Sequence, residues 1–309
     1  MEIAYFFPGQ ASQKIGMGKD LYDNFSEARR VFLMGNKFLG RDLTSLMFEG
    51  SQGELTKTIN CQPAIFLTNL AYFEVLKNKL PPFLTLGHSV GELTSLAVSG
   101  ALSEEKALDL VRIRAEAMSD CVKDLSKDEG ACRMAVIIGG KFSEIDKVCG
   151  VVYSSLKKVV QVANYNSEDQ IVISGNNDAV LRVMEILEFG GVKKTMCLGV
   201  EAAFHSDLMK PAEAIMEEAL KKVEFGKVEL PYIANFTGEL VNENNPPEEI
   251  KKLLVDQICG MVLWKDSIME ADKLGTEKFL ECGYGKTMEN LVKRDYKNLK
   301  IFKKSDYLV

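Results

Sequence analysis

The segment 83–92 constrains the fold of this 309-residue chain more than any other stretch. It opens with the apolar run Phe83-Leu-Thr-Leu86, typical of a short buried strand, and passes through Gly87-His-Ser-Val-Gly91 into a helix expected to begin near Leu93. Glycine on both sides of Ser89 permits a sharp turn, which presents the serine at the end of a sheet with the helix N-terminus behind it. The segment therefore predicts an α/β fold with a parallel sheet and a nucleophile elbow.

Segments on both sides of a central insertion are expected to build this sheet. Ile3–Phe7 has the pattern of a buried strand, a glycine-punctuated loop follows at 8–18, and a helical pattern then continues to Leu80 with a break at Gln62-Pro63. We expect residues 1–127 and 199–309 to form one α/β-hydrolase-like catalytic subdomain. Its later elements are predicted as strands at 231–236 and 279–285, the second ending in a glycine turn, and helices at 211–222, 248–259 and 264–274.

The segment 128–198 has a different pattern and is predicted to be a separate small subdomain. Strand-like and helix-like runs follow one another in the order βαββαβ, which is the split βαβ, or ferredoxin-like, arrangement. The expected strands are 132–138, 159–163, 171–174 and 193–198, and the expected helices are 143–150 and 178–189. Such a unit can be inserted in the larger α/β body.

A serine nucleophile needs a base, and the chain contains only two histidines. His88 adjoins Ser89 on the turn, where neighbouring side chains diverge, so it is poorly placed to accept the proton. His205 is therefore the predicted general base, and the order serine before histidine is that of the elbow class. Asp207 is too close to His205 in sequence to be assigned as a third member, and a backbone carbonyl could orient the imidazole instead.

An acyl-transfer intermediate also needs hydrogen-bond donors for its oxyanion. The backbone N–H of Val90, at the start of the helix, is one candidate. The second donor would come from another strand-end loop, for which Pro8-Gly9-Gln10 is the best available.

Composition and charge exclude several classes of protein. The net charge of −6 disfavours a general nucleic-acid binder, and the seven cysteines include no Cys-x-x-Cys pair, so neither a disulfide framework nor a zinc site is expected. The N-terminus lacks the basic region of a signal peptide, and no apolar run approaches the roughly 18 residues of a membrane span. We expect a cytoplasmic protein that does not contact membranes.

Several strings together resemble a known family. They are Phe7-Pro-Gly-Gln-Ala-Ser-Gln13, Gln62-Pro63, Gly87-His-Ser-Val-Gly-Glu92, Arg114 within Val111-Arg-Ile-Arg-Ala115, Asn164-Tyr-Asn-Ser167, Phe204-His-Ser-Asp-Leu-Met-Lys-Pro211 and Gln257. In this order they resemble malonyl-CoA:acyl carrier protein transacylases and the acyltransferase domains of fatty acid and polyketide synthases. The resemblance extends essentially from end to end of the chain.

The resemblance implies a role for each catalytic position. Ser89 would be the acylated nucleophile and His205 the general base and acid. The backbone amides of Gln10 and Val90 would form the oxyanion hole, with Gln10 also contacting the substrate. A loop at Gln257 would supply the carbonyl that orients His205.

The resemblance also implies how the acyl group is selected. Arg114 would form a two-pronged salt bridge with the free carboxylate of malonate, which suits the planar guanidinium. Phe204 resembles the malonyl-type form of its position, where a bulky ring would crowd an α-methyl branch. Two residues depart from the family pattern, because Ala11 stands where glycine is usual and Tyr284 stands within a usual Gly-Pro-Gly. Either could narrow the mouth of the site.

The implied reaction is ping-pong transfer of malonyl from malonyl-CoA, through a malonyl-serine ester, to the phosphopantetheine thiol of acyl carrier protein. It requires no metal or other cofactor, and a monomer is expected. Carrier proteins of this kind are acidic, so an acidic enzyme needs a basic docking surface. The candidate residues for it are Lys193, Lys194, Lys286, Lys293, Arg294, Lys297, Lys300, Lys303 and Lys304.

Three alternatives remain open from the sequence. A serine thioesterase would use the same serine and histidine with water as acceptor, although it has no use for a buried cation at Arg114. A helper module could bind carriers without transferring acyl groups, but the presence of both Ser89 and His205 argues against it. A stand-alone acyltransferase of a polyketide assembly line would carry out the same chemistry as an enzyme of fatty acid synthesis.

Overall fold

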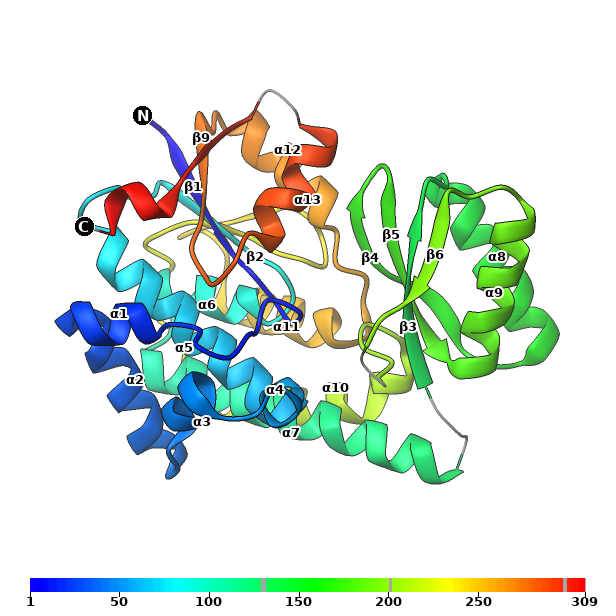
Figure 1. The fold of residues 1–309 in the computed structure, drawn as a ribbon, viewed down its shortest axis with the longest axis horizontal. Coiled ribbons are helices and arrows are strands. Elements are labelled where there is room, and N and C mark those ends of the chain that lie inside the picture. The colour runs from blue at the N-terminus through cyan, green and yellow to red at the C-terminus, as the bar shows by residue number, and fades with distance from the viewer. Residues whose placement is uncertain (129–131, 200–201, 297–298, 309) are drawn as a thin grey trace.

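Two β-sheets organise the chain in the computed structural model, which describes residues 1–128, 132–199, 202–296 and 299–308 (Figure 1). The larger sheet has the strand order β10-β9-β1-β2-β7-β8, and every neighbouring pair is parallel except β7 and β8. The expected parallel sheet with strands from both sides of the central insertion is therefore confirmed. Its strands are β1 Ile3–Phe7, β2 Leu84–Gly87, β7 Tyr232–Ile233, β8 Leu240–Val241, β9 Lys278–Glu281 and β10 Lys300–Phe302.

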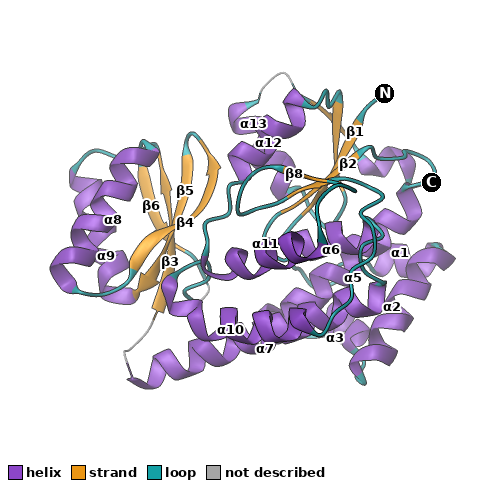
Figure 2. Cartoon of the chain, turned by 180° about the vertical axis from the view of Figure 1, so that it is seen from behind, coloured by secondary structure: helices purple, strands orange, loops and turns teal. Residues whose placement is uncertain are grey.

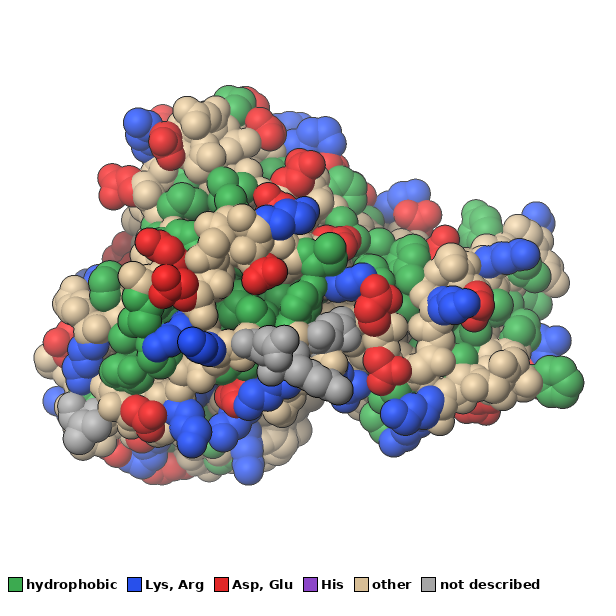
Figure 3. All heavy atoms as spheres, turned by 90° about the horizontal axis from the view of Figure 1, so that it is seen from above, with side chains coloured by type: hydrophobic (Ala, Val, Ile, Leu, Met, Phe, Trp, Pro, Cys, Tyr) green, Lys and Arg blue, Asp and Glu red, His purple; other side chains and the backbone are tan. Residues whose placement is uncertain are grey.

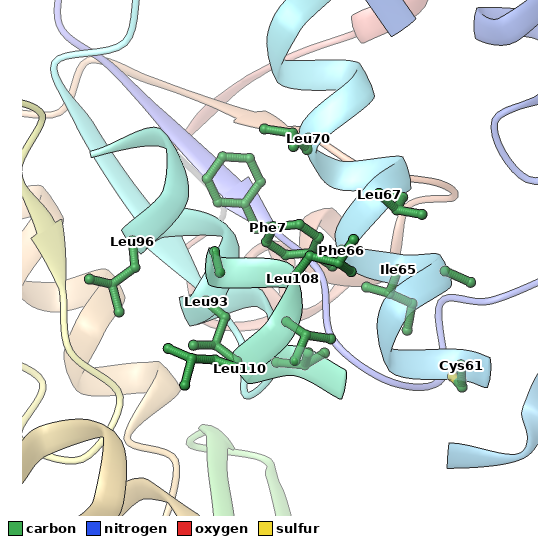
Figure 4. Packing of buried hydrophobic residues seen from close by; sticks show 14 of the residues in the cluster. Phe7, Cys61, Ile65, Phe66, Leu67, Leu70, Leu93, Leu96, Leu108 and Leu110 are labelled. Carbon is green, nitrogen blue, oxygen red and sulfur yellow. The ribbon is translucent and has the colours of Figure 1, made fainter. Parts of the chain in front are cut away.

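Strand β1 lies at the centre of this sheet, and all five of its residues are buried. Tyr5 and Phe7 belong to the main hydrophobic core on one face, whereas Ala4 and Phe6 pack with Trp264 on the other. A parallel sheet covered on both faces needs such a continuous apolar run instead of an alternating one. Figure 4 shows the ring of Phe7 among leucine and phenylalanine side chains of the surrounding helices.

Helices cover both faces of the large sheet (Figures 1 and 2). One group of helices packs on the main core, and a second group packs on the opposite face around Trp264. Most helices of the first group place one apolar face on the core, whereas α5 is buried on nearly all sides. The first group comprises α1 Lys19–Asn24, α2 Ser26–Leu39, α3 Leu43–Glu49, α4 Gln52–Thr56, α5 Thr58–Leu76, α6 Gly91–Val98, α7 Glu104–Asp128, α10 Lys210–Lys221 and α11 Pro247–Cys259. The second comprises α12 Trp264–Lys273 and α13 Thr287–Asp295, and the short 3₁₀ turns are Asp207–Met209 and Lys304–Tyr307.

The helix break expected at Gln62-Pro63 is wrong, because α5 continues through Pro63. Proline has no backbone N–H and therefore leaves the carbonyl of Ile59, four residues earlier, without its helical donor. The guanidinium of Arg41 donates to that carbonyl at 2.9 Å. Only the first turn of α5 precedes the proline, so the helix loses one hydrogen bond near its start. Arg41, in the loop before α3, supplies the replacement donor.

The smaller sheet is built from the segment between α7 and residue 199. Its strands are antiparallel in the order β4-β5-β3-β6, and both of its helices pack on one face around a separate core (Figure 2). The predicted order βαββαβ is confirmed. The elements are β3 Cys132–Ile138, α8 Phe142–Leu156, β4 Val160–Ser167, β5 Gln170–Asn176, α9 Asn177–Phe189 and β6 Lys194–Cys197.

Strand β4 fastens the smaller sheet to the rest of the molecule. The N–H of Tyr165 donates to the carbonyl of Val262, and the N–H of Val262 donates to the carbonyl of Ala163, both at 2.9 Å. Lys265 then pairs with Glu168 just beyond the strand. The smaller sheet is therefore joined to the connection between α11 and α12 by a short backbone pairing, in addition to its own chain connections.

Within the described parts of the chain, no helix combines the length and apolarity needed to cross a membrane.

Candidate active site

The turn between β2 and α6 has the backbone of a nucleophile elbow. Ser89 adopts a φ of 54°, a left-handed conformation that a non-glycine residue rarely takes. A Cβ atom on Gly87 would lie 2.0 Å from the carbonyl carbon of Gly91, and one on Gly91 would lie 2.2 Å from the carbonyl oxygen of Phe7. Both glycines are therefore required by the close approach of backbone, as the sequence pattern predicts.

Ser89 and His205 lie within hydrogen-bonding distance of each other, at 2.8 Å between Oγ and Nε2. The other ring nitrogen, Nδ1, is 2.9 Å from the backbone carbonyl of Gln257. A carbonyl can only accept, so Nδ1 carries the proton and the free lone pair of Nε2 faces the serine hydroxyl. Burial and the charge of Arg114 lower the pKa of His205 to about 3, which keeps the imidazole neutral and able to accept a proton.

The carbonyl that holds His205 belongs to the last turn of α11 and not to a loop, which corrects the expectation for Gln257. The final carbonyls of a helix have no intrahelical donor, so this one is available to the imidazole. The C-terminal end of a helix also carries partial negative charge. It would therefore stabilise an imidazolium at His205.

His88 lies beside the serine but is engaged elsewhere. Its Nε2 is 3.0 Å from Oδ1 of Asn166 on β4, and its ring packs on Trp264 with 5.4 Å between ring centroids. Burial lowers its pKa, so it is neutral. Asp207 likewise makes an ion pair with Lys210. The structure thus brings His205 to Ser89 and gives the other two residues different partners.

Arg114 lies on α7 with its side chain 2% exposed, and its guanidinium points to the serine. Its Nη2 donates to Ser89 Oγ at 3.0 Å and to Oε1 of Gln257 at 3.1 Å, while Nη1 donates to Oε1 of Gln62 at 2.8 Å. Burial lowers its pKa to about 10, so it stays charged at neutral pH. A buried cation held only by neutral groups is a strong attractor for an anion.

These residues line a pocket of about 330 Å³. Ser89, Val90, Arg114, Phe204 and His205 all contribute to its wall, together with Gln10 from the loop after β1. Met118 of α7 and Met134 of β3 add apolar side chains, so residues from both sheets' surroundings enclose the pocket. The other lining residues are Ala11, Gln13, Thr56, Gln62, His88, Met118, Met134, Asn164, Leu198 and Gly199.

The loop that carries Gln10 is packed directly on the elbow. A Cβ atom on Gly9 would lie 2.4 Å from the carbonyl oxygen of His88, so only glycine allows this approach. Asn69 on α5 donates to the carbonyl of Pro8 at 3.0 Å and fixes the loop from behind. Val90 stands at the N-cap of α6, where backbone N–H groups have no intrahelical acceptor. Gln10 and Val90 thus approach Ser89 from two sides.

Asn235, which sequence reasoning did not single out, holds the elbow in shape. It follows β7, and its side chain accepts from the N–H of Ser89 at 2.6 Å and donates to the carbonyl of Gly87 at 2.5 Å. Glu92 was noted only as part of a motif, yet its buried carboxylate accepts from the N–H of Asn235 and from the side chain of Gln257. A polar residue at a strand end is the only signal the sequence offers for Asn235.

We expect Asn235→Ala to destabilise the fold by about 3 kcal/mol, because it leaves two buried backbone groups of the elbow without partners and each costs roughly 1–3 kcal/mol. Urea-induced unfolding measures the change in free energy. Asn244→Ala is the matched control, since the Asn244 side chain is exposed and its loss should stay within about 0.5 kcal/mol. Equal, small losses for both variants would contradict the role given to Asn235.

The two departures from the family pattern lie in different places. Ala11 lines the pocket and adopts a φ of 86°, a conformation that glycine takes more easily. Tyr284 is not among the pocket-lining residues, and it packs against the main core from the turn after β9. Ala11 can therefore narrow the site, whereas Tyr284 does not reach it.

The basic residues proposed as a docking surface do not all remain available. Lys304 donates to the carbonyls of Gly283 and Gly285 and lies over the ring of Tyr72, and Lys293 pairs with Glu289. Lys297 lies outside the described residues. On the face shown in Figure 3, acidic and basic side chains are interspersed. The remaining candidates, all exposed, are Lys193, Lys194, Lys286, Arg294, Lys300 and Lys303.

Potential metal ligands are not gathered anywhere in the part of the chain that the structure describes, since no three His, Cys, Asp or Glu side chains converge. All seven cysteines lie within the described residues, and none of them forms a disulfide bond.

Comparison with known proteins yields consistent matches over the whole chain. The model of the acyl transferase domain matches residues 4–303. A malonyl CoA-acyl carrier protein transacylase from Bacillus subtilis (strain 168) is 38% identical over 306 residues, covering 99% of this chain and 94% of that protein. One of the same name from Staphylococcus aureus (strain MSSA476) is 33% identical over 300 residues, covering 97% and 94%.

Solved structures give the same result. The malonyl CoA-acyl carrier protein transacylase of Coxiella burnetii has a TM-score of 0.93 and 30% identity, covering 100% of this chain and 96% of that chain. A malonyl-transacylase in complex with its type II PKS acyl-carrier protein has a TM-score of 0.92 and 32% identity, covering 100% and 98%.

Proposed function

Because this chain belongs to the acyl transferase domain family, we propose that it transfers a malonyl group from malonyl-CoA to the phosphopantetheine thiol of acyl carrier protein. The relatives at 33–38% identity carry this activity in their names. The observation that carries the proposal is that a serine–histidine pair and a buried arginine meet at one oxygen, Ser89 Oγ. That arrangement suits an acyl group with a free carboxylate at its far end.

The first half-reaction forms a malonyl-serine ester. Ser89 Oγ attacks the thioester carbonyl while His205 Nε2 accepts the hydroxyl proton, so an O–C bond forms. The tetrahedral intermediate collapses by breaking the C–S bond, and the imidazolium returns its proton to the departing CoA sulfur. The carbonyl of Gln257 keeps the imidazole in the required tautomer throughout.

The second half-reaction runs the same steps with a different thiol. The phosphopantetheine sulfur attacks the ester carbonyl as His205 takes its proton, and Ser89 then leaves and recovers the proton. In both halves the backbone N–H groups of Gln10 and Val90 would bind the oxyanion, each donor being worth roughly 10²–10³ in rate. The close packing of the Gly9 turn on the elbow supports this pairing of donors.

Arg114 would select the acyl group. The malonyl carboxylate would accept two hydrogen bonds from the guanidinium, which then releases Ser89 Oγ and leaves it free to react. Phe204 lines the same pocket, and its ring would crowd a methyl branch on the α-carbon of the acyl group. We therefore propose malonyl over methylmalonyl as the preferred group.

The proposal is tested by measuring the intact mass of the protein after brief mixing with malonyl-CoA. A malonyl adduct is expected on the wild-type protein and not on Ser89→Ala, and a chase with holo acyl carrier protein should move it to the carrier. Acetyl-CoA serves as the comparison donor. Steady release of CoA without transfer to the carrier would indicate a thioesterase, and neither adduct nor release would indicate a helper module.

A place in polyketide assembly is the second candidate, favoured by the similarity to a malonyl-transacylase bound to a type II PKS acyl-carrier protein. The chemistry at Ser89 is the same in both pathways, and only the carrier differs. We propose fatty acid synthesis as the main role, in line with the relatives in Bacillus and Staphylococcus. Chasing the malonyl adduct with both kinds of carrier, and comparing the rates of transfer, decides between them.

Finer aspects of the organisation are part of the same proposal. Residues 1–127 and 199–309 would form the α/β-hydrolase-like catalytic subdomain, with 128–198 as a ferredoxin-like insertion, a division supported by the two separate sheets. The mechanism needs no cofactor, because proton transfer and oxyanion binding are supplied by the chain itself. We also propose a cytoplasmic monomer that binds neither nucleic acid nor membrane and docks acidic carriers through its exposed lysines.

A further inference from the structure

Glu92 is a fully buried carboxylate that the mechanism above does not use. It lies in the first turn of α6, close after Ser89, and its exposure is 0%. Burial raises the pKa of Glu92 to about 7, although the hydrogen bonds from Gln257 and Asn235 and the charge of Arg114 act to lower it. Burying a carboxylate is costly unless its contacts compensate, so a carboxylate at this position calls for a specific role.

Both hydrogen-bond donors to Glu92 also hold the reacting groups. Its Oε2 accepts from the N–H of Asn235 at 3.2 Å, and the side chain of Asn235 in turn fixes the elbow. The same oxygen accepts from Nε2 of Gln257, whose backbone carbonyl orients His205. Glu92 therefore supports the serine through one partner and the histidine through the other.

The side-chain amide of Gln257 also connects Glu92 to Arg114. Its Oε1 accepts from Nη2 of Arg114 at 3.1 Å, while its Nε2 donates to Glu92 and to the carbonyl of Ser89. A cation at the oxygen end and an anion at the nitrogen end fix the orientation of the amide and strengthen both hydrogen bonds. Glu92 is thus the counter-charge of Arg114, one amide group away, and among the described residues its Oε1 has no hydrogen-bond partner.

We propose that Glu92 is a positioning and specificity residue, which anchors Gln257 between the Ser89–His205 pair and Arg114 and competes electrostatically with the substrate carboxylate for Arg114. This inference rests on the proposed function. The charge of Arg114 is already partly balanced by Glu92 when the substrate carboxylate arrives. The carboxylated acyl group therefore binds less tightly than it would without Glu92. Binding of an acyl group without a carboxylate is not affected by this competition.

The test is single-turnover acylation of Ser89 by malonyl-CoA and by acetyl-CoA, comparing wild type with Glu92→Gln at about pH 8, above the pKa of about 7, so that Glu92 carries its charge in the wild-type protein. Glutamine keeps the size of the side chain and an oxygen that can accept from Gln257, but it removes the charge. We expect the half-saturating concentration of malonyl-CoA to fall several-fold while that of acetyl-CoA stays unchanged. The maximal acylation rate should fall by a similar factor for both donors, because the Gln257 amide is held less firmly.

Glu281→Gln is the matched control. Glu281 is also a buried carboxylate, 3% exposed, but it lies on β9 and binds the backbone N–H groups of Thr287 and Glu289 at the start of α13. Its loss should lower stability and leave the ratio of the two half-saturating concentrations unchanged. If Glu92→Gln behaves like this control, with a loss of stability and an unchanged ratio, the inference is overturned.

A second variant keeps the test decisive if Glu92→Gln does not fold. Glu92→Asp keeps the charge but withdraws it from Gln257 by one methylene, so both maximal rates should fall while the malonyl to acetyl ratio of half-saturating concentrations is retained. A changed ratio, or unchanged rates, would contradict the assigned role. Wild-type protein that forms no malonyl adduct would instead overturn the proposed function itself.

Discussion

His205→Ala is expected to slow acylation of Ser89 by malonyl-CoA about 10³-fold or more while leaving the fold intact. The imidazole Nε2 lies 2.8 Å from Ser89 Oγ, where it would accept the hydroxyl proton, and positioned proton transfer contributes roughly 10²–10⁴ in rate. His205 has a φ of 57°, in the left-handed region, and both histidine and alanine carry a Cβ atom there, so the substitution keeps a similar backbone cost. Stopped-flow mixing followed by intact-mass analysis measures the rate, and circular dichroism checks the fold.

Added imidazole provides the control for this experiment. It should partly restore acylation of His205→Ala, because the variant lacks only the base, and it should not restore Ser89→Ala, which lacks the nucleophile. A variant rate close to that of wild type would show that another group removes the serine proton.

Arg114→Ala is expected to reduce kcat/KM for malonyl loading by at least about 10²-fold and to spare or increase acetyl loading. Hydrogen bonds to a charged group are worth roughly 1.5–3 kcal/mol each, and the malonyl carboxylate would lose two of them. Acetyl loading needs no such contact, and it gains from the loss of the hydrogen bond that Nη2 donates to Ser89 Oγ. The ratio of malonyl to acetyl adduct, measured by mass on the same sample, gives the result.

Arg112→Ala is the matched control for Arg114. It lies on the same helix, but its guanidinium is partly exposed and pairs with Asp109 and Glu116. Such surface ion pairs contribute little, so loading of both acyl groups should remain at the wild-type level. Equal losses of malonyl and acetyl loading in Arg114→Ala would rule out a role for Arg114 in recognising the carboxylate.

Much of the fold could be predicted because its signals are local. The apolar run at Ile3–Phe7 and the strand, glycine turn and helix around Ser89 are decided by neighbouring residues. The alternation of elements in 132–198 is local as well. The failure at Pro63 has a long-range cause, because the carbonyl that proline leaves free is satisfied by Arg41, and nothing next to Pro63 in the sequence indicates that contact.

The site was predictable only in part, because some of its contacts join residues that are distant in the sequence. Ser89 is marked by its own glycines, and His205 follows from there being just two histidines to choose from. The approach of Arg114 and Gln257 to the serine could be inferred from family resemblance, not from spacing. The supporting roles of Asn235 and Glu92 were not predicted, because the residues that they contact are 143 to 148 positions away in the sequence.

The backbone pairing between β4 and Val262 limits how this molecule could be recombined with its relatives. In a chimera that imported only the four-stranded lobe, the hydrogen bonds at 163–165 and the Glu168–Lys265 ion pair would have to form between parts of different origin. The contact between His88 on the elbow and Asn166 on β4 would have to form across the same boundary. The natural unit of exchange is therefore discontinuous. It combines the lobe with the 262–265 segment that receives it, so crossover points belong on both sides of that segment as well as at the lobe's two ends.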